Sequence, residues 1–263
     1  VRLGRGVAEQ GIISSDPLKH AINVIDKYRK IAEAKNAPVK AVGTRVFRQA
    51  DNRREVVEQI RKKTGIYVEV LSPAEEAAAG FRGATFGRPG SKQTVVDIGG
   101  GSSEISFGEN GRIHRFTSIE NGAVAISELA IRRGAYIAKK QLSAEVEKLP
   151  DSLFVRDSQL IGIGGTATTL AGVKLNLSDY DPQAVEGTLL TTGELEEIIE
   201  QLLGMTPVQR QTFVTFAPER ADILAGGSLI LLTILKRVGW DSLIISDRGL
   251  RFGIVLNYFD FTV

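Results

Sequence analysis

The chain has 263 residues, and its 33 Lys and Arg exceed its 31 Asp and Glu by a formal net charge of +2. That length allows one or two domains with a sizeable core. A hydrophobic content of 43% with 24% charged residues is ordinary for a globular protein, which excludes disordered and fibrous classes. So small a net charge predicts no general attraction to nucleic acid or to an anionic membrane.

Cysteine and histidine contents narrow the possible chemistry. The absence of cysteine excludes disulfides, thiolate nucleophiles and zinc or iron–sulfur clusters, and it is compatible with the cytoplasm, the location we expect. Only two histidines occur, His20 and His114, so a His-rich metal site is excluded. The longest apolar stretch, around Leu229 to Leu235, is too short to span a membrane. Carboxylates, hydroxyls, backbone amides and an oxygen-ligated cation must therefore carry any reaction.

Predicted helices and strands alternate along the chain. Asp16-Pro17 begins the first helix, and Asn110-Gly111 predicts a tight hairpin. Further helices are expected at 52–64, 72–81, 123–133, 144–149, from 167, and at 193–203, 221–238 and 250–259. Strands are expected at 39–43, 66–70, 94–98, 105–107, 112–116, 159–163 and 243–245. This alternation predicts an α/β protein with mixed sheets.

A glycine turn follows a buried strand in the segment VVDIGGGSSE, residues 95–104. Backbone N–H groups in such a turn can approach phosphate oxygens closely. Asp97 and Glu104 can hold a hard cation, and Mg²⁺ suits these oxygen ligands. An ordinary tight turn is the alternative interpretation of this segment taken alone. The candidate phosphate donors are Gly99, Gly100, Gly101, Ser102 and Ser103.

A second glycine turn occurs in IGIGGTATTL, residues 161–170. Gly164 and Gly165 follow a strand and Thr166 begins a helix, which places free amides and the positive end of a helix dipole together. Neither turn matches the P-loop or the dinucleotide-binding fingerprint, so these nucleotide enzymes are disfavoured. The two turns together predict a phosphate chain gripped between sheets, with two unrelated turns as the alternative.

Several motifs occur in a family-specific order. VVDIGGGSSE, IGIGGTATTLA and ISDRGLRFGIV resemble segments of the exopolyphosphatase/guanosine pentaphosphate phosphatase family, which belongs to the superfamily of actin, sugar kinases and Hsp70 ATPase domains. Further similar segments are VRLGRGV at 1–7, VGTRVFRQADN at 42–52 and VEVLSPAEEA at 68–77. The resemblance therefore covers nearly the whole chain.

The resemblance implies an α/β fold of two ribonuclease H-like (actin-like ATPase) domains, with mixed sheets and an interdomain cleft. We expect the first domain to comprise 1–75 plus 251–263 and the second to comprise 76–250. The family's first phosphate motif, D-x-G-[ST]-x-S, is missing from this chain, which begins just after its expected place. We expect truncation rather than a real loss of this motif.

The resemblance also implies an activity: water cleaves the terminal phosphoanhydride of polyphosphate or guanosine pentaphosphate with the help of Mg²⁺ or another divalent cation. Glu76 aligns with the family's catalytic carboxylate and Arg48 with a phosphate-binding arginine. A solvated acid at a helix start and a surface arginine are the respective alternatives. Asp97 and Glu104 match the acidic positions that hold the cation.

The sequence is also compatible with two other functions. One is a phosphotransferase of the same fold, although no acceptor motif is recognisable. The other is a non-catalytic sensor that binds polyphosphate or guanosine pentaphosphate or tetraphosphate. The expected partners are these phosphate compounds and, by resemblance to the family, a second copy of the chain in a homodimer; neither nucleic acid nor a membrane is expected.

Overall fold

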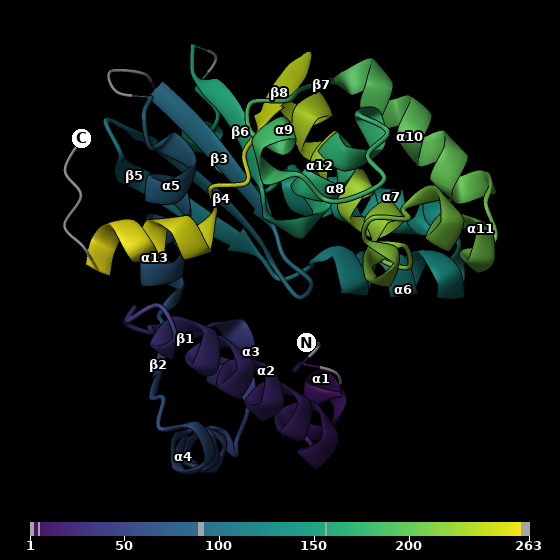
Figure 1. Cartoon of the computed structure of the whole chain (residues 1–263). Coiled ribbons are helices and arrows are strands. Elements are labelled where there is room, and N and C mark those ends of the chain that lie inside the picture. Colours follow the sequence, from purple (N-terminus) through teal and green to yellow (C-terminus); the bar gives the residue numbers. More distant parts are fainter. Residues whose placement is uncertain (1–2, 5, 89–91, 156, 259–263) are drawn as a thin grey trace. The chain divides into compact units, whose positions relative to one another are not determined.

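The computed structural model describes residues 3–4, 6–88, 92–155 and 157–258 (Figure 1). Residues 1–2 and 5 of the predicted N-terminal segment, and residues 259–263 of the predicted closing segment, lie outside this range. Contacts divide the chain into two units, Val1–Glu76 and Ala77–Val263.

The first unit packs helices around a small parallel sheet. Its strands β1 and β2 pair in parallel, with Val42 opposite Glu69. Helix α4 ends as predicted at Gly65, whose left-handed φ of 74° few other residues adopt. Val56 and Ile60 on α4 are buried in the core of this unit. The elements are α1 (Val7–Gln10), α2 (Ser15–Glu33), β1 (Ala41–Gly43), α3 (Arg45–Gln49), α4 (Arg53–Thr64) and β2 (Val68–Val70).

A six-stranded mixed sheet forms the centre of the second unit, in the order β5-β4-β3-β6-β8-β7. Strands β3, β6 and β8 run parallel to one another, whereas β4, β5 and β7 pair antiparallel to their neighbours. The predicted α/β class with a mixed sheet is therefore confirmed. The strands are β3 (Lys92–Ile98), β4 (Ser103–Glu109), β5 (Arg112–Ile119), β6 (Gln159–Ile163), β7 (Leu189–Thr191) and β8 (Ser242–Ile245).

Helices cover both faces of this sheet (Figure 1). Val96 and Ile105 on one face belong to the core formed with α6, α7, α8, α10 and α12. Val95 and Ile163 on the other face pack with Phe81 of α5. The helices are α5 (Pro73–Thr85), α6 (Ala123–Arg133), α7 (Ala135–Val146), α8 (Gly164–Lys174), α9 (Pro182–Val185), α10 (Thr192–Gly204), α11 (Pro207–Phe213), α12 (Leu224–Val238) and α13 (Leu250–Tyr258), with short 3₁₀ turns at Asp151–Leu153 and Pro218–Arg220.

The last helix, α13, packs against α5 through glycines. A β-carbon on Gly253 would overlap the carbonyl of Ala79, and one on Gly83 would overlap the carbonyl of Gly249. The close approach explains why α13 lies in the second unit. Residues 251–258, which the resemblance assigned to the first domain, therefore group with the second unit.

The apolar stretch around Leu229 lies in α12, and its leucines and isoleucines are buried in the main core. Among the helices of the described residues, none has both the length and the apolar character needed to cross a bilayer.

Candidate functional site

The two glycine turns leave the sheet at the same edge. Strands β3 and β6 are parallel neighbours, and Asp97 near the end of β3 lies opposite Ile163 at the end of β6. The turn that begins at Gly99 follows β3, and Gly164 follows β6. The carboxyl ends of parallel strands form the edge where α/β proteins bind ligands. This placement favours one shared site over two unrelated turns.

The first turn, Gly99 to Ser103, is held against the start of α6. The carbonyls of Gly99 and Gly100 accept hydrogen bonds from the amides of Ala123 and Val124, at 2.9 and 3.0 Å. The buried hydroxyl of Ser103 donates to the Asn121 carbonyl at 3.0 Å. Ser102 is also buried, whereas Gly100 and Gly101 are exposed. The exposed part of this predicted phosphate loop is therefore the backbone of Gly100 and Gly101. The Ser103 hydroxyl is already hydrogen-bonded to the protein itself.

The second turn begins α8 and has two side chains pressed against its glycines. Gly164 has a left-handed φ of 81°, and a β-carbon there would overlap Asp97 Oδ1. A β-carbon on Gly165 would overlap the guanidinium of Arg220. At Gly164 the left-handed backbone and the Asp97 carboxylate together require glycine, whereas at Gly165 a larger residue would displace the flexible Arg220 side chain. A carboxylate and a guanidinium therefore both reach the start of α8.

Thr166 is 5% exposed, and its hydroxyl lies where a β-carbon on Gly227 of α12 would be. Its side chain therefore packs against α12. The first turn of α8 offers backbone N–H groups and the positive end of the helix dipole to an anion. Arg220 was not predicted, because it lies far along the chain and no motif connects it with Gly165.

The two predicted cation ligands lie side by side. Asp97 on β3 is directly opposite Glu104 on β4, so both side chains are on one face with β-carbons about 4.5–5.5 Å apart. The Ser118 hydroxyl donates to Glu104 at 3.0 Å. A β-carbon built on Gly80 of α5 would lie 4.0 Å from Asp97 Oδ2.

Facing carboxylates repel each other, and a hard cation between them relieves that repulsion. The oxygen donors fit Mg²⁺, which binds one or two carboxylates and keeps waters or phosphate oxygens as its other ligands. Within the described residues no group of three or more His, Cys, Asp or Glu side chains could hold a metal. A metal bound at Asp97 and Glu104 therefore needs ligands from water and substrate.

Arg48 and Glu76 form an ion pair within the first unit. Arg48 Nη1 donates to Glu76 Oε2 at 2.7 Å and to the Leu71 carbonyl at 2.8 Å. The two side chains are only 22% and 19% exposed. Glu76 is thus neither a freely solvated acid nor a residue of the helix cap.

The neighbouring Glu75 has a different role. Its carboxylate accepts from the Ser72 amide at 2.7 Å, and its own amide donates to the Ser72 hydroxyl at 3.2 Å. This reciprocal capping box begins α5. The hydrogen bond from the Ser72 backbone holds the pKa of Glu75 below its usual value.

A hydrogen-bonded network joins the end of β8 to α8. The Tyr180 hydroxyl donates to Asp247, and Thr168, which is next to this hydroxyl, donates to the Gly164 carbonyl at 3.1 Å. Burial, followed by the hydrogen bond to Asp247, raises the pKa of Tyr180 to about 12. The phenol therefore stays protonated at physiological pH. Neither Tyr180 nor Asp247 was among the predicted site residues.

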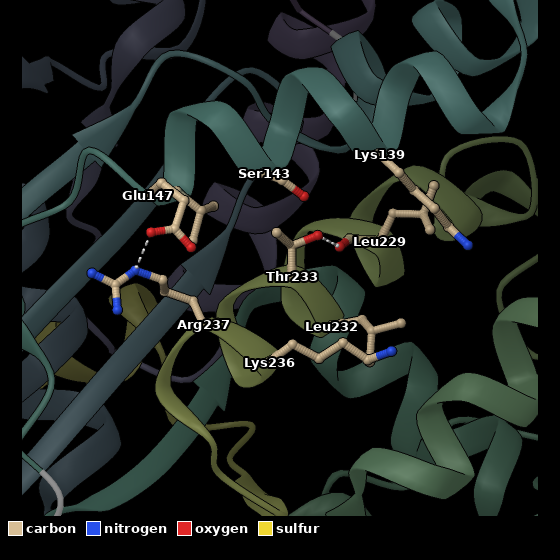
Figure 2. Close-up of a pocket in the computed structure, with 9 residues that line it drawn as sticks. Lys139, Ser143, Glu147, Leu229, Leu232, Thr233, Lys236 and Arg237 are labelled. Atoms are coloured by element: carbon tan, nitrogen blue, oxygen red, sulfur yellow. Dashed lines mark hydrogen bonds and ion pairs between the residues drawn. The ribbon is translucent and has the colours of Figure 1, made fainter.

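A separate pocket of about 270 Å³ lies between α7 and α12 (Figure 2). Lys139, Leu229 and Arg237 are among its lining residues, and none of the predicted site residues lines it. Arg237 is paired with Glu147 and Asp151, at 3.1 and 2.6 Å. Much of the positive charge of this pocket is thus neutralised by the protein itself.

Relatives with named activities cover most of the chain. Exopolyphosphatase 2 of Mycobacterium tuberculosis is 29% identical over 276 residues, which cover 98% of this chain and 86% of that protein. A guanosine-5'-triphosphate,3'-diphosphate pyrophosphatase of Vibrio cholerae is 24% identical over 264 residues, 97% of this chain and 52% of that protein.

Solved structures show the same relationship. The crystal structure of the Aquifex aeolicus Ppx/GppA family member is 30% identical with a TM-score of 0.83, covering 98% of this chain and 86% of that one. An exopolyphosphatase from Cytophaga hutchinsonii is 25% identical with a TM-score of 0.84, covering 98% and 86%. The profile of the Ppx/GppA phosphatase family matches residues 1–260. This chain therefore belongs to the Ppx/GppA phosphatase family.

Proposed function

We propose that this protein is a Mg²⁺-dependent hydrolase that removes the terminal phosphate of inorganic polyphosphate, of guanosine pentaphosphate, or of both. The observation that carries the proposal is the meeting of two glycine turns at one sheet edge, next to the facing carboxylates Asp97 and Glu104. The names of the two relatives, an exopolyphosphatase and a guanosine pentaphosphate pyrophosphatase, support these two substrates.

In this proposal the backbone of the two turns holds the phosphate chain. The donors are the amides of Gly99, Gly100, Gly101, Ser102 and Ser103 in the first turn and those of Gly164, Gly165 and Thr166 in the second. Asp97 and Glu104 would hold Mg²⁺, which would neutralise charge on the phosphate oxygens. Arg220, which lies against Gly165, adds a guanidinium on the anion side of the second turn.

Glu76 is the group that we assign to the attacking water. A carboxylate within hydrogen-bond reach of a water can orient it and accept its proton. Arg48 can offer its remaining N–H groups to a phosphate oxygen while Nη1 holds Glu76.

The distribution of charge also supports a polyanionic substrate. Residues 1–76 contain 15 Lys and Arg against 10 Asp and Glu, a net +5, whereas residues 77–263 contain 18 against 21, a net −3. The positive charge of residues 1–76 favours a phosphate chain beside Arg48, whereas the two glycine turns lie in the net negative unit and bind through their amides.

We further propose that the two units correspond to two ribonuclease H-like domains, the first ending near residue 75. The sheet of the second unit supports this. Its strands β3, β4 and β5 form an antiparallel meander, and β6 and β8 then add in parallel on the other side of β3.

The test is phosphate release by the full-length protein from polyphosphate and from guanosine pentaphosphate, with Mg²⁺ and with EDTA. We expect Mg²⁺-dependent release, and the ratio of the two kcat/KM values identifies the preferred substrate. Tight binding of either compound without release would contradict the hydrolase and favour the sensor. Transfer of phosphate to an acceptor other than water would favour the phosphotransferase.

A further inference from the structure

Arg48 is anchored to the backbone as well as to Glu76. Its Nη1 uses one hydrogen for the Leu71 carbonyl and the other for Glu76 Oε2. Leu71 is buried, and its amide donates to the carbonyl of Gly43 at the end of β1. The guanidinium is therefore attached to a fixed point of the first unit, just after β2.

This anchoring restricts the Glu76 carboxylate. A partly buried, charge-assisted hydrogen bond of 2.7 Å is both short and directional. Glu76 lies in the first turn of α5 and is held from a second element, α3, through Arg48. The hydrogen bond from Arg48 of α3, in addition to the rotamer preference of Glu76, therefore fixes the position of its carboxylate.

The planar guanidinium of Arg48 would also restrict where a bound phosphate oxygen lies relative to Glu76. Both hydrogens of Nη1 are engaged by the protein, so a phosphate oxygen would bind through Nε or Nη2. Because the group is rigid and planar, a phosphate oxygen and Glu76 Oε2 would then be held in one plane at a fixed separation. A lysine in its place would keep the charge and lose this geometry.

We propose that Arg48 is a positioning residue, which sets the Glu76 carboxylate relative to the phosphoryl group and so acts on the reaction through Glu76. This inference rests on the proposed hydrolase function. If Arg48 were only a phosphate ligand, its loss would raise KM. Because it acts through Glu76, its replacement by lysine lowers kcat.

The kinetic test compares Arg48→Lys with Arg61→Lys, a matched change on the exposed end of α4. We expect kcat of Arg48→Lys to fall by about 10²-fold, the cost of a misplacement near 1 Å, while KM changes by less than about threefold. Arg61→Lys is expected to change neither constant. A raised KM with an unchanged kcat for Arg48→Lys would overturn the proposal.

A double variant tests whether the effect passes through Glu76. In the Glu76→Gln background, Arg48→Lys should lower kcat by less than about threefold, because residues that act as a unit are strongly non-additive. A further loss of about 10²-fold in that background would overturn the positioning role. Thermal unfolding of each variant shows whether a loss of rate is only a loss of folded protein.

The orientation of Glu76 provides a readout that needs no turnover. In a crystal structure of Arg48→Lys we expect the Glu76 carboxylate to have left its wild-type position, with the rest of α5 unchanged. An unmoved carboxylate would contradict the inference. If the wild-type protein released no phosphate, the proposed function would fail, and this structural comparison would still decide whether Arg48 positions Glu76.

Discussion

At the scale of single residues, the candidate site contains a glycine at a position where a neighbouring atom leaves no room for a β-carbon. Gly164 combines a left-handed φ of 81° with Asp97 Oδ1 at the position of a β-carbon. The sequence predicts Gly164 as a residue of a phosphate loop, and the structure gives a steric reason why glycine stands there. The neighbouring carboxylate could not be inferred from the spacing of the motif.

Gly164→Ala is expected to destabilise the protein and to reduce phosphate release. The left-handed backbone alone costs an alanine about 1–2 kcal/mol, and Asp97 must also move. Gly187→Ala is the matched control, because Gly187 has a φ of 84° with no atom within 4 Å of its β-carbon position. Urea unfolding and phosphate release should show a larger loss for Gly164→Ala in both measurements. Equal losses in the two variants would contradict the contact with Asp97.

Tyr180 predicts a pH dependence of stability. Its pKa is about 12 in the folded protein against 10.0 for an unperturbed tyrosine, because burial and the hydrogen bond to Asp247 favour the neutral phenol. A raised folded pKa means that its contribution to stability is complete below pH 10 and is lost as the pH rises through about 12.

Urea unfolding across this alkaline range is the measurement, with Tyr180→Phe as the reference. We expect the stability of the wild type to fall more steeply than that of Tyr180→Phe between pH 10 and about 12. Parallel curves for the two proteins would argue against a protected Tyr180 phenol.

At the scale of elements, the sequence predicted the helices and strands that have a clear hydrophobic pattern or characteristic turn residues. The Asn110-Gly111 hairpin forms with left-handed φ values of 53° and 71°, and α6 and β6 have the expected bounds. By contrast, only the end of α7 was predicted, because its start carries exposed apolar residues such as Tyr136. Strand β7 has three residues and is recognisable only through its pairing with β8.

The start of α8 shows why a boundary is hard to predict. Glycines disfavour a helix interior, so the sequence predicted a start just after them, at residue 166 or 167. The helix in fact begins at Gly164, where the Asp97 carboxylate leaves no room for a β-carbon. Tertiary contacts here overrode the local preference.

The capping box at the start of α5 is expected to stabilise the folded protein. Ser72→Ala removes the hydroxyl that accepts from the Glu75 amide, so we expect it to lower the free energy of unfolding by about 1 kcal/mol. Ser14→Ala is the matched control, because Ser14 precedes α2 and makes no side-chain cap hydrogen bond. Chemical denaturation of both variants is the measurement. An equal effect at the two positions would show that the Ser72 hydroxyl does not cap α5.

At the scale of the whole molecule, the motifs predicted that two glycine turns act together, and the sheet brings these turns to one edge. The parallel pairing of β3 with β6 brings together two turns that are about sixty residues apart in the sequence. The sequence did not show that the Ser103 hydroxyl is hydrogen-bonded to the Asn121 carbonyl or that Thr166 packs against Gly227 of α12, because both contacts are long-range. Contacts between distant side chains, such as Arg48 with Glu76, have no signature in the sequence.

The most direct test of the central claim is to compare Glu76→Gln with Glu75→Gln in Mg²⁺-dependent phosphate release. Glutamine can replace Glu75 in a capping box, so that variant is expected to keep the wild-type kcat. Glu76→Gln removes the proposed acceptor of the water's proton, and its kcat should fall by about 10²–10⁴-fold. A Glu76→Gln variant with wild-type kcat would contradict the assignment of Glu76 as the catalytic carboxylate.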